Sequence, residues 1–406
     1  MRRLVFLNRF FFPDHSATSR LLTDLAFHLA ARGLEIHVIT SRQLYTSPRE
    51  CLPAQEIVNG VRIHRVQSTG FGREALPGRV IDSATFCRST RRRALSVARS
   101  GDVLVAMTDP PLLSFAAMRV ARRTGARLVN WLHDLYPEIA AQLRVPLMAG
   151  ALGRSFAYFR DLSLQSAGAN VVVGQLMAQR VKSRGIAAER VHLIPNWSDD
   201  EHISPVSHAD NPLRQAWGLA DKFVVGYSGN LGRAHEFETV LSAAERLRGF
   251  PIVFLFVGGG HQFDRLAQRA RQCELRNFQF MPYQDAEALK YSLGVADIHI
   301  VSLRAELEGL SVPSKFYGVA AAGRPTVAIG SSDGEIARLV RQHASGLVIE
   351  SGNGEKLAQE LIVLMKEPQR TVEMGARART MLDAHFARKH ALARWQELLT
   401  RTAQHN

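Results

Sequence analysis

Both halves of this 406-residue chain repeat one pattern, in which a short apolar run is followed by a segment with helical spacing of apolar residues. In the first half, a strand predicted at 3–7 precedes the helical pattern 19–32, and a second strand is predicted at 35–40. Strands and helices that alternate in this way form a parallel sheet, because each crossover helix packs on a face of that sheet. The pattern restarts at 223–228, so we expect two α/β domains.

Composition narrows the class of protein. The three cysteines are far apart and match no metal or redox spacing, which is typical of a reducing compartment. No apolar run approaches the ~20 residues that span a bilayer, and Asn8 and Arg9 interrupt the first apolar run, so we expect a strand there instead of a signal peptide.

The net charge of +14 suits three kinds of partner: nucleic acid, an anionic membrane surface or a phosphorylated substrate. A nucleic-acid partner is disfavoured because the aromatic residues do not interleave with the basic ones and no known nucleic-acid motif is present. An Arg-rich solvated surface is the alternative to all three.

An acidic loop follows the strand predicted at 297–303. Glu306 and Glu308 lie in this loop, Gly309 permits a tight turn, and Ser311 is expected to cap a helix that ends at Gly323. A helix start offers free backbone N–H groups to a phosphate, and Lys315 would add a positive charge. This pattern predicts a ligand site at the carboxyl end of a strand, with an ordinary solvated loop as the alternative.

The string EGLSVPSKFYGVAAAGRP at 308–325 resembles the acidic loop of GT-B nucleotide-sugar glycosyltransferases, specifically glycosyltransferase family 4. It is most similar to the bacterial branch that builds exopolysaccharides and O-antigens, such as colanic-acid fucosyltransferases and N-acetylfucosamine transferases. The resemblance spans nearly the whole chain and includes Pro195-Asn196, which matches the family's junction between domains. It implies an α/β GT-B fold with two Rossmann-like domains facing a central cleft. The expected parts are an acceptor-side domain at 1–198, a linker at 199–212, a nucleotide-sugar-binding domain at 213–370, and C-terminal helices at 371–406 that cross back to the first domain.

The resemblance also implies site residues. Glu308 would hold hydroxyls of the donor sugar, and His133, with Asp134 beside it, would lie at the reaction centre. The catalytic residues are expected to be His133, Glu308 and Asp134. The donor-binding residues are expected to be Ser16, Ala17, Gly229, Asn230, Arg233, His235, Gly258, Gly259, Tyr283, Glu306, Gly309, Leu310, Ser311 and Lys315. A structural histidine at the end of a strand is the alternative for His133.

The sequence departs from the family pattern in three places. Ser16-Ala17 replaces the usual Gly-Gly pair, and Asn230 stands where the family has a phosphate-binding arginine, so we expect Arg233 to substitute. His235 lies at or next to the place of the family's second phosphate-binding cation, a lysine. The family's second glutamate, eight residues after the first, corresponds to Phe316, so the ribose is bound differently.

The expected function is a retaining glycosyltransferase that moves a sugar from a UDP- or GDP-sugar to a polyprenyl-linked or other saccharide acceptor. We expect no metal cofactor, because no Asp-x-Asp motif is present. The basic, apolar segment 139–160 suggests peripheral binding to the anionic inner face of the bacterial inner membrane, with a core-packing helix as the alternative. Two other functions stay open: a sugar-nucleotide epimerase of the same fold and a basic nucleic-acid-binding protein.

Overall fold

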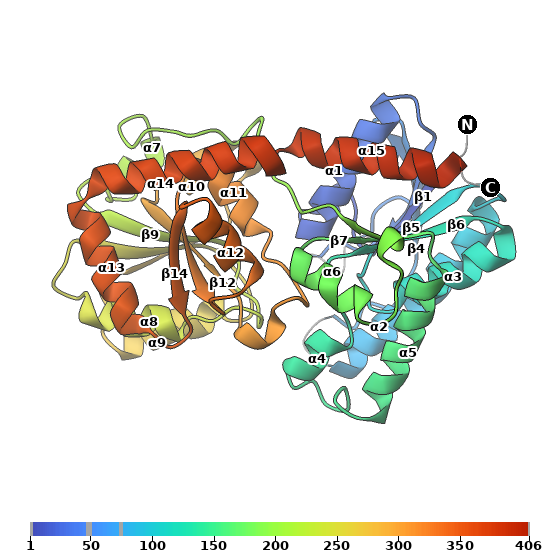
Figure 1. Cartoon of the computed structure of the whole chain (residues 1–406), viewed down its shortest axis with the longest axis horizontal. Coiled ribbons are helices and arrows are strands. Elements are labelled where there is room, and N and C mark those ends of the chain that lie inside the picture. The colour runs from blue at the N-terminus through green and yellow to red at the C-terminus, as the bar shows by residue number, and fades with distance from the viewer. Residues whose placement is uncertain (1–2, 46–50, 73–75, 405–406) are drawn as a thin grey trace. The chain divides into compact units, whose positions relative to one another are not determined.

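The computed structural model describes residues 3–45, 51–72 and 76–404. The chain divides into two compact units (Figure 1). The first unit contains Met1–Pro195 and Ala391–Asn406, and the second contains Asn196–His390. Each unit is built around one sheet with helices packed against its faces, so the prediction of two Rossmann-like α/β units is confirmed.

The sheet of the first unit has eight strands within the described residues, in the order β3-β4-β2-β1-β5-β6-β7-β8. All neighbours are parallel except β3 and β4, a hairpin whose turn residues Asn59 and Gly60 have φ of 47° and 79°. The strands are β1 (Leu4–Leu7), β2 (Ile36–Ser41), β3 (Gln55–Val58), β4 (Val61–Val66), β5 (Val103–Ala106), β6 (Arg127–Leu132), β7 (Ala169–Val172) and β8 (Val191–Leu193).

The helices of the first unit cover this sheet, and the last helix of the chain joins them. Trp395 of that helix packs on Trp131 of β6, with 4.5 Å between ring centroids, and both side chains are fully buried. The helices are α1 (Ala17–Ala31), α2 (Leu76–Val97), α3 (Leu113–Thr124), α4 (Glu138–Gln142), α5 (Ala151–Ser166), α6 (Gln175–Lys182) and α15 (Arg388–Gln404).

Helix α2 begins earlier than its sequence suggests. Residues 71–79 are rich in glycine, proline and charge, which favours a loop, but the helix already starts at Leu76, and residues 73–75 lie outside the described part of the chain. The side chain of Asp82, in the second turn of α2, accepts hydrogen bonds from the backbone N–H groups of Phe71 and Gly72 at 3.1 and 3.2 Å. This tertiary contact fixes the chain in front of the helix despite its glycine- and proline-rich sequence.

The described part of the second unit contains a parallel sheet of six strands, in the order β11-β10-β9-β12-β13-β14. The strands are β9 (Phe223–Asn230), β10 (Ile252–Gly259), β11 (Phe278–Met281), β12 (Ile298–Ser302), β13 (Thr326–Gly330) and β14 (Gly346–Glu350). The helices are α7 (Pro212–Ala216), α8 (Glu238–Arg246), α9 (Phe263–Gln272), α10 (Leu289–Gly294), α11 (Lys315–Ala321), α12 (Glu335–Gln342), α13 (Gly354–Lys366) and α14 (Pro368–Met381).

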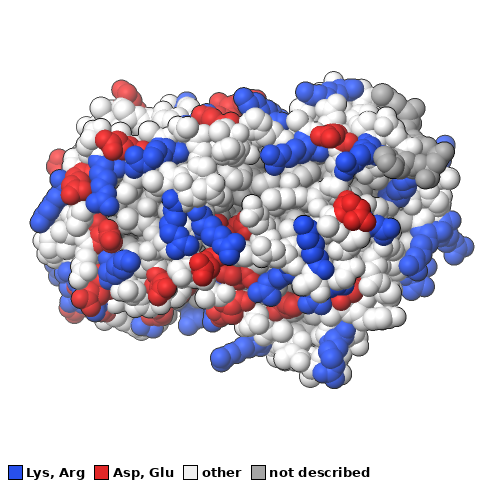
Figure 2. All heavy atoms as spheres, viewed as in Figure 1, with Lys and Arg blue, Asp and Glu red and all other residues white. Residues whose placement is uncertain are grey.

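Charged side chains are widely distributed. Figure 2 shows Lys and Arg spread over both units on the face in view, with Asp and Glu among them. None of the described helices combines the length and the hydropathy that a membrane-spanning helix requires.

Candidate active site

In the sheet of the second unit, the chain adds strands on one side of β9 (β10, then β11) and afterwards on the other side (β12, β13, β14). We call the position between β9 and β12, where the strand order reverses, the switch point. β9 pairs with β10 on one side and with β12 on the other, and all three strands are parallel. The loops that leave the carboxyl ends of β9 and β12 therefore separate, which is where open α/β sheets bind ligands. The two loops are tied together by the backbone N–H of Arg304, which donates to the carbonyl of Ala234 at 2.9 Å.

The amine of Lys315 lies against the end of β9. It donates to the carbonyl oxygen of Asn230 at 3.1 Å and lies 3.0 Å from Nε2 of His235. It also lies 5.0 Å from the centroid of the Tyr227 ring, within the range of a cation–π contact. Burial lowers the pKa of Lys315 to about 7, because the charged form has lost water. The switch point therefore contains a lysine whose pKa is lowered.

Both ring nitrogens of His235 have hydrogen-bond partners. Nδ1 lies 2.7 Å from the carbonyl oxygen of Ser302, and Nε2 faces the amine of Lys315. Burial, followed by the nearby Lys315 charge, lowers the pKa of His235 to about 3, so the ring is neutral. Because a carbonyl oxygen can only accept, the proton is on Nδ1, and Nε2 accepts from Lys315.

Gly258 lets the ends of β10 and β9 approach each other closely beside Lys315 and His235. A Cβ on Gly258 would lie 2.3 Å from the carbonyl oxygen of Gly229, and the φ of Gly258 is +139°. The sequence did not indicate Gln262, whose side-chain amide donates to the carbonyls of Gly232 and His235 at 2.7 and 3.0 Å. Gln262 therefore braces the β9–α8 loop, and its position just after a glycine turn was the one available signal.

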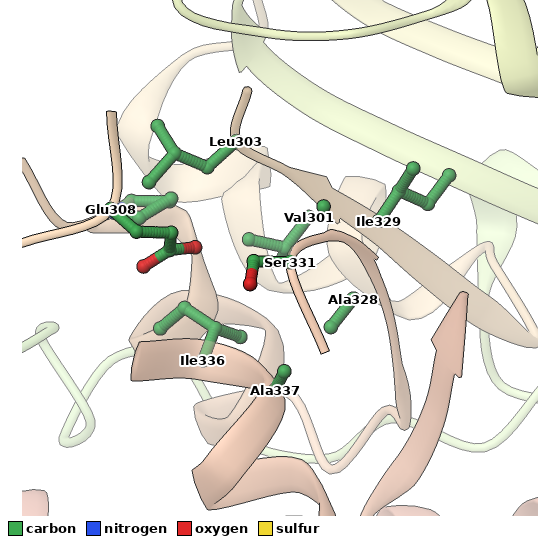
Figure 3. A pocket seen from close by; sticks show the side chains of 10 residues that line it. Val301, Leu303, Glu308, Ala328, Ile329, Ser331, Ile336 and Ala337 are labelled. Atoms are coloured by element: carbon green, nitrogen blue, oxygen red, sulfur yellow. The ribbon is translucent and has the colours of Figure 1, made fainter. Parts of the chain in front are cut away.

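Glu308 lies in the loop after β12 and lines a small pocket (Figure 3). Its Oε2 accepts a hydrogen bond of 3.1 Å from the backbone N–H of Glu335, the first residue of α12. A negative charge at the start of a helix is stabilised by the helix dipole. The pocket is lined mostly by apolar side chains at the ends of β12 and β13 and on α12: Val301, Leu303, Pro313, Ala328, Ile329, Ile336 and Ala337, with Gly330 and Ser331.

The expected helix start at Ser311 is wrong. Helix α11 begins at Lys315, and the residue before it, Ser314, makes no side-chain cap. Ser311 instead forms an isolated β-bridge with Glu308, so the residues between them fold as a tight loop around Gly309, whose φ is +73°. Leu310 within this loop is buried.

Four predicted donor-binding residues of the second unit are exposed: Asn230, Arg233, Tyr283 and Glu306. Arg233 lies in the β9–α8 loop and makes no ion pair or hydrogen bond with the residues that the structure describes. Glu306 pairs with Arg304 at 2.9 Å, and Tyr283 lies beside Gly259 after β11. Phe316, at the place of the family's second glutamate, is buried in the core and presents no group to a ribose.

The remaining predicted residues belong to the first unit. His133 follows β6 and is buried, and burial lowers its pKa to about 3, so it is neutral at neutral pH. Its Nε2 has no hydrogen-bond partner among the described residues. Asp134 follows it and is half-buried. Ser16 precedes α1, its N–H donates to Asp14 at 2.8 Å, and Ala17 is the exposed first residue of α1.

Glu138 anchors the loop that carries His133. Its carboxylate forms a two-bond pair with the guanidinium of Arg160, at 2.9 Å for each bond, and also contacts Arg184. Arg160 in addition donates to the carbonyl of Tyr136 at 2.9 Å. These bonds fix the loop between β6 and α5 and commit the Glu138 carboxylate to arginine.

Metal ligands do not gather in the described residues: no group of three or more His, Cys, Asp or Glu side chains there is arranged to hold a metal ion.

Two protein families match this chain, one after the other. The family described as "Glycosyl transferase 4-like domain" matches residues 17–197, and the family described as "Glycosyl transferases group 1" matches residues 210–381. The second match includes the whole switch point with Lys315, His235 and Glu308.

Two relatives are more than 30% identical to parts of the chain. WcaI of Escherichia coli (strain K12), named as a colanic acid biosynthesis glycosyl transferase, is 33% identical over 57% of this chain and 58% of its own length. WbjE of Pseudomonas aeruginosa, named as a glycosyltransferase, is 31% identical over 62% of this chain and 63% of its own length. The chain thus matches less than two thirds of the length of either relative.

Solved structures share the fold at low identity. Sucrose-phosphate synthase from Thermosynechococcus elongatus superposes with a TM-score of 0.79 at 17% identity, over 99% of both chains. Anabaena Alr3699/HepE in complex with UDP-glucose superposes with a TM-score of 0.72 at 16% identity, over 99% of this chain and 100% of that one. The predicted GT-B fold and family are therefore confirmed, and the chain belongs to glycosyltransferase family 4.

Proposed function

We propose that this protein is a retaining glycosyltransferase that moves a sugar from a UDP- or GDP-sugar to a precursor of a cell-surface polysaccharide. The observation that carries the proposal is the amine of Lys315, which lies half-buried at the switch point of the second unit and has a lowered pKa. Among the described residues, no carboxylate pairs with it. A half-buried amine without a counter-charge favours an anionic ligand, and the diphosphate of a nucleotide-sugar supplies one.

The same residues suit the chemistry of sugar transfer. The diphosphate gains negative charge as its bond to the anomeric carbon breaks, so cations placed beforehand stabilise the transition state more than the ground state. Lys315 would place its ammonium form against the bound diphosphate, and the exposed Arg233 would close on the diphosphate from the β9–α8 loop. Glu308 would accept hydrogen bonds from the donor sugar, and the exposed Glu306 is a second candidate for that contact. The diphosphate then needs no metal ion to neutralise it.

The first unit would supply the acceptor side. His133 is neutral because burial lowers its pKa to about 3, and its unpartnered Nε2 is suited to a hydrogen bond with a sugar hydroxyl. Asp134 follows directly in the chain and would bind a further hydroxyl. In a retaining reaction the acceptor hydroxyl attacks from the side on which the diphosphate leaves.

We further propose that the acceptor is a polyprenyl-diphosphate-linked saccharide on the inner face of the bacterial inner membrane. WcaI is named for colanic acid biosynthesis, which supports a polysaccharide product. The segment that includes α4 and α5 exposes Leu147 by 75% and Tyr158 by 61%, and Arg144 and Arg154 are exposed in the same segment. Apolar side chains flanked by arginines bind anionic lipid surfaces.

A nucleotide panel tests the donor site. We expect one of UDP, GDP or ADP, with EDTA present, to raise the unfolding temperature, and its sugar conjugate to raise it further. Arg233→Gln should weaken stabilisation by the nucleotide, whereas Arg265→Gln, an exposed arginine on α9, should not. No stabilisation by any nucleotide or conjugate would contradict the proposal, and conversion of a UDP-sugar without an acceptor would indicate an epimerase instead.

A further inference from the structure

The Lys315–His235 pair contains one interaction that the proposed function does not use. His235 lies where a phosphate ligand was expected, but neither of its ring nitrogens is available to a phosphate. Nδ1 is 2.7 Å from the carbonyl of Ser302, and Nε2 is 3.0 Å from the amine of Lys315. A neutral imidazole has a single N–H, and here it points to Ser302.

The side chain of Lys315 has three N–H groups when it is protonated. One donates to the carbonyl of Asn230 at 3.1 Å, and one donates to Nε2 of His235. The Tyr227 ring covers another side of the amine, and the hydroxyl of Tyr227 donates to the same Asn230 carbonyl at 2.8 Å. Two fixed acceptors therefore set the direction of the third N–H.

We propose that His235 is a positioning residue that aims the amine of Lys315 at the diphosphate of the donor, and that this amine takes up a proton when the diphosphate binds. The proposal rests on the proposed function, because it assigns roles within the same donor site. It differs from the expected role of His235, which was direct contact with phosphate.

The tautomer of His235 determines which ring nitrogen donates and which one accepts the hydrogen bond from Lys315. The Ser302 carbonyl lies at the end of β12, and the hydroxyl of the same residue accepts from the backbone N–H of Glu236 at 3.3 Å. The loop after β9 is thus held on β12 at both residues, and the ring cannot turn without losing its bond to Ser302. Nε2 consequently stays an acceptor and favours the protonated form of Lys315.

Proton uptake follows from the surroundings of the amine. The titratable groups that face it are His235 and Tyr227, both uncharged, because burial lowers the pKa of His235 to about 3 and raises that of Tyr227 well above its usual value. Burial is the cause of the lowered pKa of Lys315, about 7, so near neutral pH a sizeable fraction of the protein has an uncharged amine. An anionic diphosphate favours the ammonium form, and binding then draws a proton from solution.

Calorimetric binding of UDP, GDP and inorganic pyrophosphate to the full chain tests the proposal at several pH values. Titrations in buffers of different ionisation enthalpy give the number of protons taken up. For wild type we expect uptake, and an affinity that falls by about tenfold per pH unit above about pH 7.5, where the unliganded amine is mostly neutral. For Lys315→Arg we expect the uptake and this pH dependence to disappear, because arginine stays charged.

Two substitutions at His235 separate positioning from folding. His235→Leu removes the acceptor and should lower the affinity for these probes by about tenfold, the value of a hydrogen bond to a charged group. His235→Gln can place its side-chain oxygen near the position of Nε2 and should recover most of the loss. His343→Leu, at the far end of α12, is the matched control and should bind like wild type.

The outcomes distinguish this proposal from the proposed function. Binding by wild type that is unchanged in His235→Leu, or that shows no proton uptake, overturns the positioning proposal and leaves the donor site in place. A pH dependence that persists in Lys315→Arg also overturns it. Failure of wild type to bind any of the three probes overturns both proposals together.

Discussion

The carboxylate of Glu308 accepts a hydrogen bond of 3.1 Å from the backbone N–H of Glu335, at the first residue of α12. Glu308 belongs to the loop after β12, and Glu335 begins the helix that follows the neighbouring strand, β13. The bond joins the acidic loop to the helix that follows the next strand, and it orients the carboxylate that we propose to hold the donor sugar. This contact allows the role of Glu308 in stability to be separated from its role in binding.

Substitution of Glu308 should affect both stability and sugar recognition. Glu308→Ala removes the acceptor for Glu335 N–H and should lower the free energy of unfolding by about 1–2 kcal/mol, as loss of a helix cap does. Glu308→Gln keeps an oxygen at the helix start and should cost less than Glu308→Ala. If the proposed role is correct, both variants should still bind the nucleoside diphosphate and lose the added affinity of the sugar conjugate. Equal loss of affinity for both ligands would indicate a folding defect instead.

Gly334→Ala should disturb the same contact from the other side. A Cβ on Gly334 would lie 2.2 Å from Oε1 of Glu308, so either the carboxylate or the start of α12 must move. The carboxylate ends a flexible side chain and can turn away, so we expect denaturant unfolding to show a loss of about 0.5–1.5 kcal/mol, the value of its hydrogen bond to Glu335. Gly249→Ala is the matched control, because a Cβ there meets no atom within 4 Å. Equal stability of the two variants would contradict the geometry.

Arg160 should be among the most sensitive arginines of the first unit. Its guanidinium is buried and pairs with both Glu138 and Asp161, so its removal leaves these carboxylates with only the partly exposed Arg184. We expect Arg160→Ala to cost about 2–3 kcal/mol, and Arg154→Ala, at an exposed position on the same helix, to cost within about 0.5 kcal/mol. Urea unfolding of both variants measures the difference, and similar values for the two would show that the network contributes little.

Trp395 should hold the last helix on the first unit. Its side chain is fully buried against Trp131, whose ring in turn lies 5.0 Å from that of His133. Trp395→Ala should lower stability by about 3–5 kcal/mol, and Trp395→Phe by less, because a smaller cavity is left. The midpoint of denaturant unfolding reports both. An alanine variant as stable as wild type would mean that α15 is not part of the core of this unit.

Acid should destabilise the protein through its buried histidines. Burial lowers the pKa of His133 and His235 to about 3 and of His299 to about 4, below the usual value of histidine. The unfolded chain then binds more protons than the folded one below about pH 6.5, so each group lowers stability by about 1.4 kcal/mol per pH unit as the pH falls toward about 4. Free energies of unfolding measured between about pH 4 and 7 should show this slope. His299→Asn should reduce it by about one proton, and an unchanged slope would argue against a neutral buried His299.

Much of the fold could be predicted from the sequence, because strands such as 251–257 are continuous apolar runs bounded by glycine and helical patterns. Local signals were less reliable at helix starts. With the hydrogen bonds of Asp82, helix α2 begins earlier than expected, at Leu76. With the bridge between Glu308 and Ser311, helix α11 begins later than expected, at Lys315. In both cases a contact made by residues outside the regular helix pattern decided where the helix begins.

The candidate active site, too, could be predicted from the sequence only in part. The switch point and the acidic loop could be located from the order of elements and from the resemblance to the family. The bond between His235 and Lys315 could not, because it joins residues 80 positions apart through the pairing of β9 and β12. The same holds for Gln262, whose role depends on two carbonyls of a neighbouring loop.

The most direct test of the central claim compares nucleotide binding by wild type, Lys315→Met and Lys356→Met, an exposed lysine on α13. Isothermal titration with the nucleoside diphosphate that stabilises wild type measures all three affinities. We predict that Lys315→Met lowers the affinity by at least about tenfold, the value of a charge-assisted contact to phosphate, and that Lys356→Met leaves it unchanged. Equal affinities for wild type and Lys315→Met would contradict a donor diphosphate site at the end of β9.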